Sequence, residues 1–90
     1  MTQLEIIHLR LAGGHPPGLI DGINRSISGI CDEGSVRIFR HATVESDLGI
    51  HISVETEASV ARPSDLGLRL TAALREHGMV DHTVWIEAQS

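Results

Sequence analysis

The 90-residue sequence contains no lysine and no tyrosine, so all seven of its Lys/Arg positions are arginines. Without lysine this chain cannot form a Schiff base with a carbonyl substrate, and it lacks the lysine of a phosphate-binding loop. Without tyrosine it has no phenol group for acid–base chemistry. These two absences exclude several kinds of catalysis before any motif is considered.

Cysteine is also scarce, because Cys31 is the only one. A single cysteine cannot form a disulfide within the chain, and small domains without disulfides are typical of the reducing cytoplasm. The stretch MTQLEIIHLRL has Glu5, His8 and Arg10 inside its apolar run, which fits neither a signal peptide nor a membrane-spanning helix. We therefore expect a cytoplasmic protein.

Positive charge is outweighed by negative charge. The chain has 12 acidic residues against seven arginines and a formal net charge of -5. Proteins that bind nucleic acids need basic patches to neutralise phosphates, and anionic membrane surfaces attract basic segments in the same way. The sequence shows no basic stripe and predicts neither a nucleic-acid partner nor a membrane partner.

The composition is that of a folded protein, with 41% hydrophobic and 21% charged residues. Residues 1–90 are expected to form one domain, because the chain is too short for two independent cores. A core of this size confers little stability, and burial of further apolar surface between two copies would add to it. Size alone therefore favours a homodimer.

Hydrophobic periodicity predicts six elements. Residues 48–55, LGIHISVE, alternate strictly between apolar and polar or small, which is typical of a half-buried strand. Apolar residues from Leu19 to Ile30 recur at three- and four-residue steps and predict a helix. Ser64 is a good N-cap for a second helix, and Gly78 is expected to end it. The expected elements are a strand at 4–11, a helix at 19–30, strands at 35–43 and 48–55, a helix at 64–77 and a strand at 82–87.

This order of elements predicts an α+β fold, the ferredoxin-like βαββαβ sandwich. Right-handed crossovers give a four-stranded antiparallel sheet with strand order 4-1-3-2 and two helices on one face. The opposite face of the sheet would then be uncovered, and the side chains on it follow from the period-2 alternation. They are expected to be Ile6, His8, Arg10, Arg37, Phe39, His41, His51, Ser53, Thr83, Trp85 and Glu87.

The uncovered face would gather the only phenylalanine, the only tryptophan and three of the six histidines. This depends on the second strand, where Phe39 competes with Val36 and Ile38 for the buried side, and a change of parity would turn Phe39 and His41 inward. Aromatic residues and arginine beside aliphatic ones suit a protein interface, with Trp85 as anchor. The expected interface or ligand-binding residues are His8, Arg37, Phe39, His41, His51 and Trp85.

The segment HATVESDLGIH, residues 41–51, suggests two further functions. His41, His51 and Asp47 are candidates for acid–base catalysis in a cofactor-free enzyme, monooxygenase- or isomerase-like, with its site in the cleft between sheet and helices. Asp47 beside Ser46 is also explained by turn chemistry, in which short polar side chains bind the local backbone. In that case His41 and His51 would only flank a polar turn.

The second possibility is a metal site, because imidazoles on neighbouring strands can bind zinc, with Asp47 or Glu55 as a further ligand. The sequence contains no pair of histidines at helical spacing and no pair of cysteines. We therefore assign no metal ligands and expect no cofactor. A homodimer that binds a small molecule or has a regulatory role remains the leading hypothesis.

The order of elements and the chain length resemble the dimeric α/β-barrel group of ferredoxin-like proteins, which includes antibiotic-biosynthesis-type monooxygenases and stress-responsive barrel proteins. Two protomers pack sheet against sheet in that group, so the resemblance implies a homodimer. It covers the whole chain as architecture only, and no catalytic residue is carried over from it. The stretches FRHATVESDLGIHI and LGLRLTAALREHGMVDHTVWIE look like a group of short uncharacterised bacterial proteins, which implies no activity.

Overall fold

The computed structural model describes residues 1–13, 17–28, 35–44, 46–55 and 62–88. Cys31 and residues 14–16 lie outside these ranges. In chain order the elements are β1 (Thr2–Leu11), α1 (Leu19–Ser28), β2 (Ser35–Arg40), β3 (Asp47–Glu55), α2 (Asp65–Leu74) and β4 (Gly78–Ile86).

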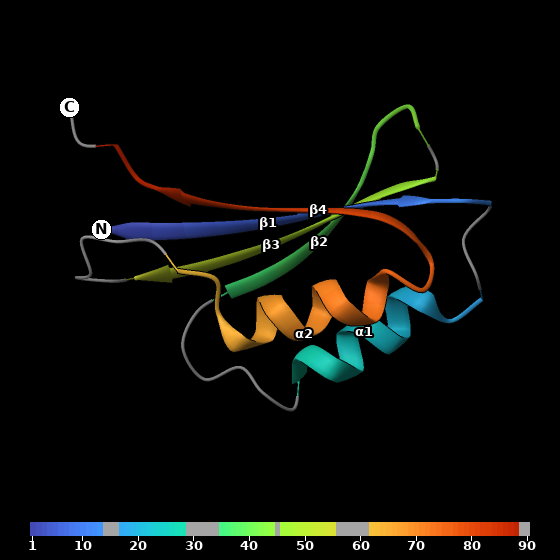
Figure 1. Cartoon of the computed structure of the whole chain (residues 1–90), viewed down its shortest axis with the longest axis horizontal. Helices are drawn as coiled ribbons and strands as arrows, with labels where there is room; N and C mark the ends of the chain where they lie inside the picture. The colour runs from blue at the N-terminus through green and yellow to red at the C-terminus, as the bar shows by residue number, and fades with distance from the viewer. Residues whose placement is uncertain (14–16, 29–34, 45, 56–61, 89–90) are drawn as a thin grey trace.

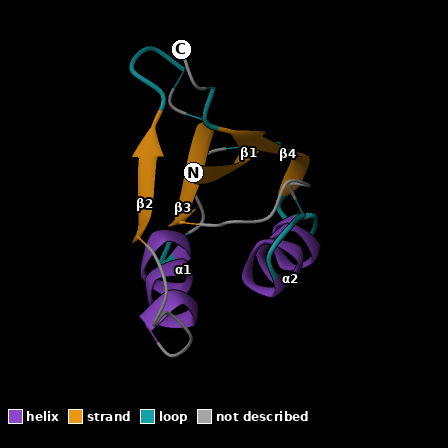
Figure 2. Ribbon diagram, turned by 90° about the vertical axis from the view of Figure 1, so that its left-hand side faces the viewer, coloured by secondary structure: helices purple, strands orange, loops and turns teal. Residues whose placement is uncertain are grey.

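The four strands form one antiparallel sheet in the order β2-β3-β1-β4. This is the predicted order 4-1-3-2 read from the other edge. Both helices lie on the same side of the sheet (Figures 1 and 2). The predicted α+β architecture of two layers is therefore confirmed for the described residues. Neither described helix is long and apolar enough to cross a membrane.

The core lies between the sheet and the helices. Successive side chains of a strand point to opposite faces, so β1 buries Ile7 and Leu9 while β3 buries Ile50 and Ile52. Leucines of α2, such as Leu70, pack against them from the helix layer. Burial of one such side chain contributes about 1.5 to 3 kcal/mol. These contacts hold the helices against one face and leave the other free.

The free side of the sheet is called the open face below. Val36 and Ile38 pack against the core, whereas Phe39 is 43% exposed and its ring centroid lies 4.6 Å from that of His51. Phe39 therefore points away from the helices, and the predicted parity of the second strand is confirmed. The strand itself is shorter than predicted, because a turn begins at His41.

The start of α2 was predicted correctly and its end was not. The Ser64 side chain caps the helix by accepting the backbone N–H of Gly67 at 3.0 Å. The helix ends at Leu74, and Gly78 to Asp81 are the first residues of β4 rather than a turn. They pair with the end of β1, where a side chain at Gly78 would overlap the carbonyl oxygen of Arg10. Glycine is needed there for close approach of two strands, not to terminate a helix.

Candidate functional site

The strand register arranges the open face in rows of side chains. In the central row Asp81, His8, Gly49 and Phe39 lie opposite one another on β4, β1, β3 and β2. Gly49 has no side chain, so nothing fills the space between His8 and Phe39. The result is a hollow of about 230 Å³. This Gly49 hollow is lined by Ile6, His8, Phe39, Arg40, His41, Asp47, Leu48, Gly49 and His51.

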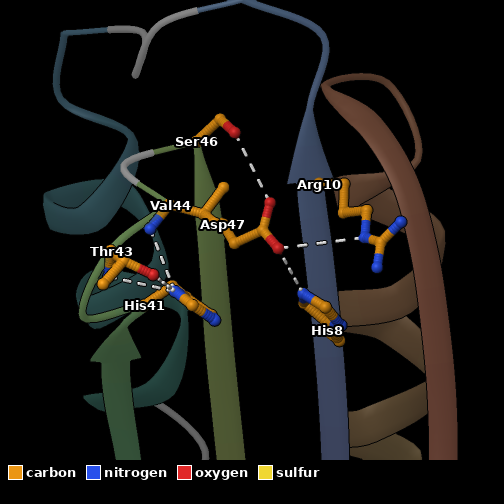
Figure 3. A network of polar contacts seen from close by, with 7 residues as sticks. All are labelled: His8, Arg10, His41, Thr43, Val44, Ser46 and Asp47. Carbon is orange, nitrogen blue, oxygen red and sulfur yellow. Dashed lines mark hydrogen bonds and ion pairs between the residues drawn. The ribbon is translucent and has the colours of Figure 1, made fainter.

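Asp47 is one of the residues that line the Gly49 hollow, and its side chain joins β3 to β1 (Figure 3). Its Oδ2 is 2.9 Å from His8 Nε2 and 3.8 Å from Arg10 Nε, while its Oδ1 accepts a hydrogen bond from Ser46 Oγ at 3.5 Å. Arg10 is directly opposite Asp47 in the register, and His8 is its diagonal neighbour. The side chain thus belongs to the sheet, and its interpretation as a residue serving its own turn is wrong.

Asp47 is ionised at neutral pH. The hydrogen bond from His8 lowers the pKa of this carboxyl below its ordinary value of 3.8, against the effect of burial, which raises it. Charge interactions with Arg10, and with His8 and His41 when they are protonated, lower the pKa further. Only 7% of the residue is exposed. A partly enclosed carboxylate that is charged at neutral pH therefore faces the His8 ring.

His41 is held by the hairpin turn that it begins. Its Nδ1 accepts the backbone N–H groups of Thr43 at 3.1 Å and Val44 at 3.0 Å (Figure 3). Because backbone N–H groups can only donate, Nδ1 carries no hydrogen, and the ring hydrogen is on Nε2. His41 therefore presents a fixed N–H donor at the border of the Gly49 hollow, which it lines.

His51 occupies the next row down, between Ile6 on β1 and Arg37 on β2. Its ring stacks at a tilt of 48° against Phe39. Its Nε2 lies 3.7 Å from the position that a Cβ of Gly49 would take. This nitrogen points into the space left by the missing side chain, so His8, His41 and His51 all border one hollow.

Asp47 is the single acidic residue among the lining residues of the Gly49 hollow, and its carboxylate is already bound to His8 and Arg10. Arg40 also lines the hollow, but it pairs with the buried Leu48, so its side chain points to the helix side of the sheet. On the open face the hollow is therefore bordered by three imidazole rings and one carboxylate.

Two predicted residues lie on the open face outside the Gly49 hollow. Trp85 is opposite Leu4 near the other end of the sheet, is 58% exposed and donates from Nε1 to Thr83 Oγ1 at 2.9 Å. Arg37 lines a second depression, of about 390 Å³, together with Phe39 and His51. The six expected interface residues therefore share one face, but only His8, Phe39, His41 and His51 line the Gly49 hollow.

A metal function finds no support in the geometry. Among the residues that the structure describes, no group of three or more His, Cys, Asp or Glu side chains is placed to hold a metal ion. Glu55, named as a possible ligand, is at the far end of β3, where it accepts a hydrogen bond from Thr2 Oγ1 at 2.6 Å. It cannot join Asp47 in one site.

Sequence reasoning missed a buried pair on the helix side of the sheet. Glu5 is fully buried, with its Oε2 2.9 Å from His82 Nε2 and its Oε1 accepting the backbone N–H of Ser64 at 2.8 Å. The available signal was that Glu5 shares its strand parity with Ile7 and Leu9. Both oxygens of Glu5 have hydrogen-bond partners, and these contacts join β1, β4 and α2. We therefore assign the pair a structural role.

A larger hollow of about 320 Å³ separates the two helices, but it contains none of the predicted site residues. His77 is the single titratable side chain among its lining residues. The chemistry is therefore concentrated on the open face. The predicted set His41, His51 and Asp47 is brought together there, and not in a cleft between sheet and helices as expected. The odd-numbered positions of β3 point to the open face, which accounts for this difference.

Comparison of the chain with protein-family models, curated proteins and solved structures finds no match in any of the three.

Proposed function

We propose that this protein is a ferredoxin-like domain that forms a homodimer in the cytoplasm through the open face of its sheet. The single observation that carries the proposal is Trp85, a large apolar side chain that is 58% exposed on a sheet face that neither helix covers. Phe39 lies on the same face at the other edge of the sheet. Exposed aromatic residues gathered on one face are typical of interfaces.

The size of the open face fits this partner. Four strands at about 4.8 Å spacing and about ten residues at 3.3 Å rise give roughly 600 Å² in projection. Stable interfaces bury about 800 Å² of accessible surface on each partner. A second copy of the sheet therefore offers a surface of suitable area, and its burial would stabilise a chain with so small a core.

The two edges of the open face complement each other. Arg37 and Phe39 lie on edge strand β2, while Asp81 and Trp85 lie on edge strand β4. A two-fold axis parallel to the strands places β2 of one copy over β4 of the other. Each aromatic edge then meets the other aromatic edge, and each arginine comes near an aspartate of its partner.

Sedimentation equilibrium from low to high micromolar concentration tests the homodimer. The wild-type chain should dimerise, and Trp85→Glu should be monomeric because it places a charge in the interface. Leu68→Glu is the matched control, because Leu68 is 52% exposed but lies on α2. A wild type that stays monomeric at high micromolar concentration contradicts the proposal, as does dissociation caused by Leu68→Glu alone.

Charge variants provide a second test that does not depend on the aromatic residues. Arg37→Glu and Asp81→Arg should each weaken association, whereas the double variant should restore it, because it reverses both charges of the pair. Additive losses in the double variant would exclude the proposed orientation of the two copies.

A second candidate function is a cofactor-free enzyme that uses acid–base chemistry. The observation that favours it is the convergence of His41, His51 and Asp47, together with His8, on one hollow. These groups transfer protons and do not carry electrons, which favours the isomerase-like alternative over the monooxygenase-like one. The test is deuterium uptake from D2O by small carbon acids in the presence of the protein. Exchange no faster than in protein-free buffer for every compound would exclude this function.

A further inference from the structure

We infer that self-association through the open face is controlled by pH, because protonation of His41 and His51 weakens the contact with the second copy. This inference rests on the homodimer proposed above and names its regulation. The copies are expected to associate at neutral pH and to separate in mildly acidic solution. His8, the third histidine of the open face, is assigned no part in this switch.

The open face contains the groups that such a switch needs. Three of the six histidines of the chain border the Gly49 hollow on this face. Histidine is the side chain that ordinarily changes its charge between pH 5 and 8. The carboxylates and arginines of the same face keep their charge in that range. A pH change within it therefore acts on the open face through imidazole rings.

His51 has no partner for a positive charge on its own copy. It lies between Ile6 on β1 and Arg37 on β2, and its ring stacks against Phe39. Within the described ranges it forms no ion pair with a carboxylate. Its charged neighbour in the register, Arg37, has the same sign as a protonated imidazole. Protonation of His51 therefore places an unpaired positive charge on the face.

Protonation of His41 also disrupts the hairpin turn. Nδ1 of the neutral ring accepts the backbone N–H groups of Thr43 and Val44 at 3.1 and 3.0 Å. A protonated imidazole is a donor at both nitrogens and cannot accept either group. Both hydrogen bonds are thus lost when Nδ1 takes up a proton. The charged ring is then no longer held at the border of the Gly49 hollow.

His8 differs from the other two rings because it already faces a carboxylate. Its Nε2 is 2.9 Å from Oδ2 of Asp47, which is ionised at neutral pH. A second proton on His8 converts this contact into a charge-assisted hydrogen bond between opposite charges. Acid therefore leaves no unpaired charge at His8, and this residue is excluded from the switch.

The proposed arrangement of the two copies covers the other two rings with apolar side chains. Because the two-fold axis runs parallel to the strands, each row of one copy meets the same row of the other. Ile6 and His51 share one row, so Ile6 of the second copy lies over His51. The largely exposed Met79 lies over His41 in the same way. The row that gives this contact consists of Met79, Arg10, Asp47 and His41.

The remaining charged groups of the open face do not offset these charges. Arg10 on β1 is bound to Asp47 on β3. Asp81 on β4 comes near Arg37 on β2 of the second copy in the proposed pairing, so it is also engaged. No carboxylate is left for the two covered rings. Burial of an unpaired charge is strongly unfavourable, so the dimer selects the neutral imidazoles.

The expected sign is opposite to the effect of the overall charge. The chain has a net charge of -5 with neutral histidines, so two copies repel each other at neutral pH. Protonation of histidines reduces this repulsion and would favour association in acid. Long-range repulsion is screened beyond about 8 Å at physiological ionic strength, whereas charges buried in the contact are screened much less. The contact therefore decides, and acid weakens association.

Sedimentation equilibrium of the full chain at about pH 7.5 and about pH 5.5, at the same ionic strength, tests the inference. Histidine in water is roughly 90% protonated at the lower pH. Exclusion of one charged imidazole from the dimer then weakens association about 10-fold, and each copy contributes two rings. We expect the association constant of the wild type to fall by at least about 10-fold. Circular dichroism at both pH values separates dissociation from unfolding.

Variants assign the effect to particular rings. His41→Asn and His51→Gln carry uncharged side chains, so each should remove part of the pH dependence and the double variant most of it. The single variants keep the test decisive if the double variant does not fold. His77→Gln is the matched control, because His77 lines the hollow between the helices rather than the open face. It should retain the full pH dependence.

The outcomes separate this inference from the homodimer itself. Equal or stronger association of the wild type at the lower pH overturns the inference and leaves the homodimer standing. A wild type that is monomeric at both pH values overturns both. Unfolding at the lower pH, or an unchanged pH dependence in the double variant, also overturns the inference. Loss of the pH dependence in His8→Gln but not in the double variant overturns the assignment to His41 and His51.

Discussion

The carboxylate of Glu5 and the imidazole of His82 meet inside the core, with Oε2 of Glu5 2.9 Å from Nε2 of His82. The second oxygen of Glu5 accepts the N–H of Ser64, the N-cap of α2. The first strand, the last strand and the second helix are therefore joined through one buried side chain. On the opposite side of the same sheet lies the Gly49 hollow, so the two polar clusters are separated by the strands themselves.

Glu5→Ala is expected to lower the free energy of unfolding by about 3 to 5 kcal/mol, because it leaves a buried histidine and a buried backbone N–H without their partner. Glu5→Gln should lose less, since an amide can still accept from Ser64. Urea unfolding followed by circular dichroism measures both. Glu55→Ala, at an exposed site, is the control and should change little. A loss below about 1 kcal/mol for Glu5→Ala would contradict this role.

The same substitution should have opposite effects in the two helices. Gly67→Ala in α2 would overlap Oε2 of Glu5 and crowd His82, which predicts a loss of about 1 to 3 kcal/mol. Gly22→Ala in α1 adds a Cβ that meets no described atom outside its own helix turn within 4 Å, and it should gain about 0.5 to 1 kcal/mol. Thermal unfolding compares the two variants. A stability change of the same sign in both variants would show that Gly67 is not needed for packing against Glu5.

Acid should remove the stabilisation that Asp47 provides. Its pKa in the folded protein is lowered first by the hydrogen bond from His8, then by the nearby charges of His8, Arg10 and His41, against an opposing effect of burial. A lowered folded-state pKa contributes stability above the unfolded value of 3.8 that is lost as the pH falls below it. The difference between wild type and Asp47→Asn in unfolding free energy should be constant near neutral pH and shrink in acid. If this difference in unfolding free energy grew in acid, the pKa of Asp47 would not be lowered in the folded protein.

Two substitutions of His41 should distinguish its structural role in the hairpin turn from its role in proton transfer. His41→Asn keeps an oxygen that can accept the N–H groups of Thr43 and Val44, as asparagine does in turns. His41→Ala removes the acceptor and should cost about 1 kcal/mol. For a domain of this size that is about 4 to 8 °C in Tm. Both variants should lose proton exchange, because neither has an imidazole. Equal Tm values for the two variants would mean that the turn does not depend on this acceptor.

The fluorescence of Trp85 can report association, because the chain has no other tryptophan and no tyrosine. Its indole is largely exposed in a single copy and should leave water when a second copy covers the open face. The emission maximum of the wild type should shift to shorter wavelength as concentration rises and return on dilution. Asp81→Arg should keep the long-wavelength emission over the same range. Emission independent of concentration in the wild type would exclude burial of Trp85 by self-association.

The arrangement of the sheet could be predicted because it depends on local patterns. The alternation of Leu48, Ile50 and Ile52 with smaller or polar residues identified β3 and its buried face. Once the order of elements was known, the neighbours of each strand followed from topology. The open face and its histidines could therefore be inferred without coordinates.

Strand ends and specific partners could not be predicted in this way. Gly78 was expected to end a helix, but its place in β4 depends on the carbonyl of Arg10, which is distant in sequence. Asp47 reaches His8 across 39 positions of the chain, and only the register between β1 and β3 reveals this contact. The importance of Gly49 was also hidden, because a missing side chain matters only when its neighbours are known.

The Gly49 hollow lies on the same face of the sheet as the proposed self-association surface, so binding of a ligand and association of a second copy would be coupled. If both copies enclose the ligand, its binding raises the association constant, and dimerisation raises ligand affinity by the same factor. If the second copy must instead leave before the ligand enters, ligand binding lowers the association constant, and dimerisation lowers ligand affinity by the same factor. In either case the concentration of this protein in the cell would affect the fraction of its hollows that hold a ligand, because dimerisation and ligand binding would influence each other.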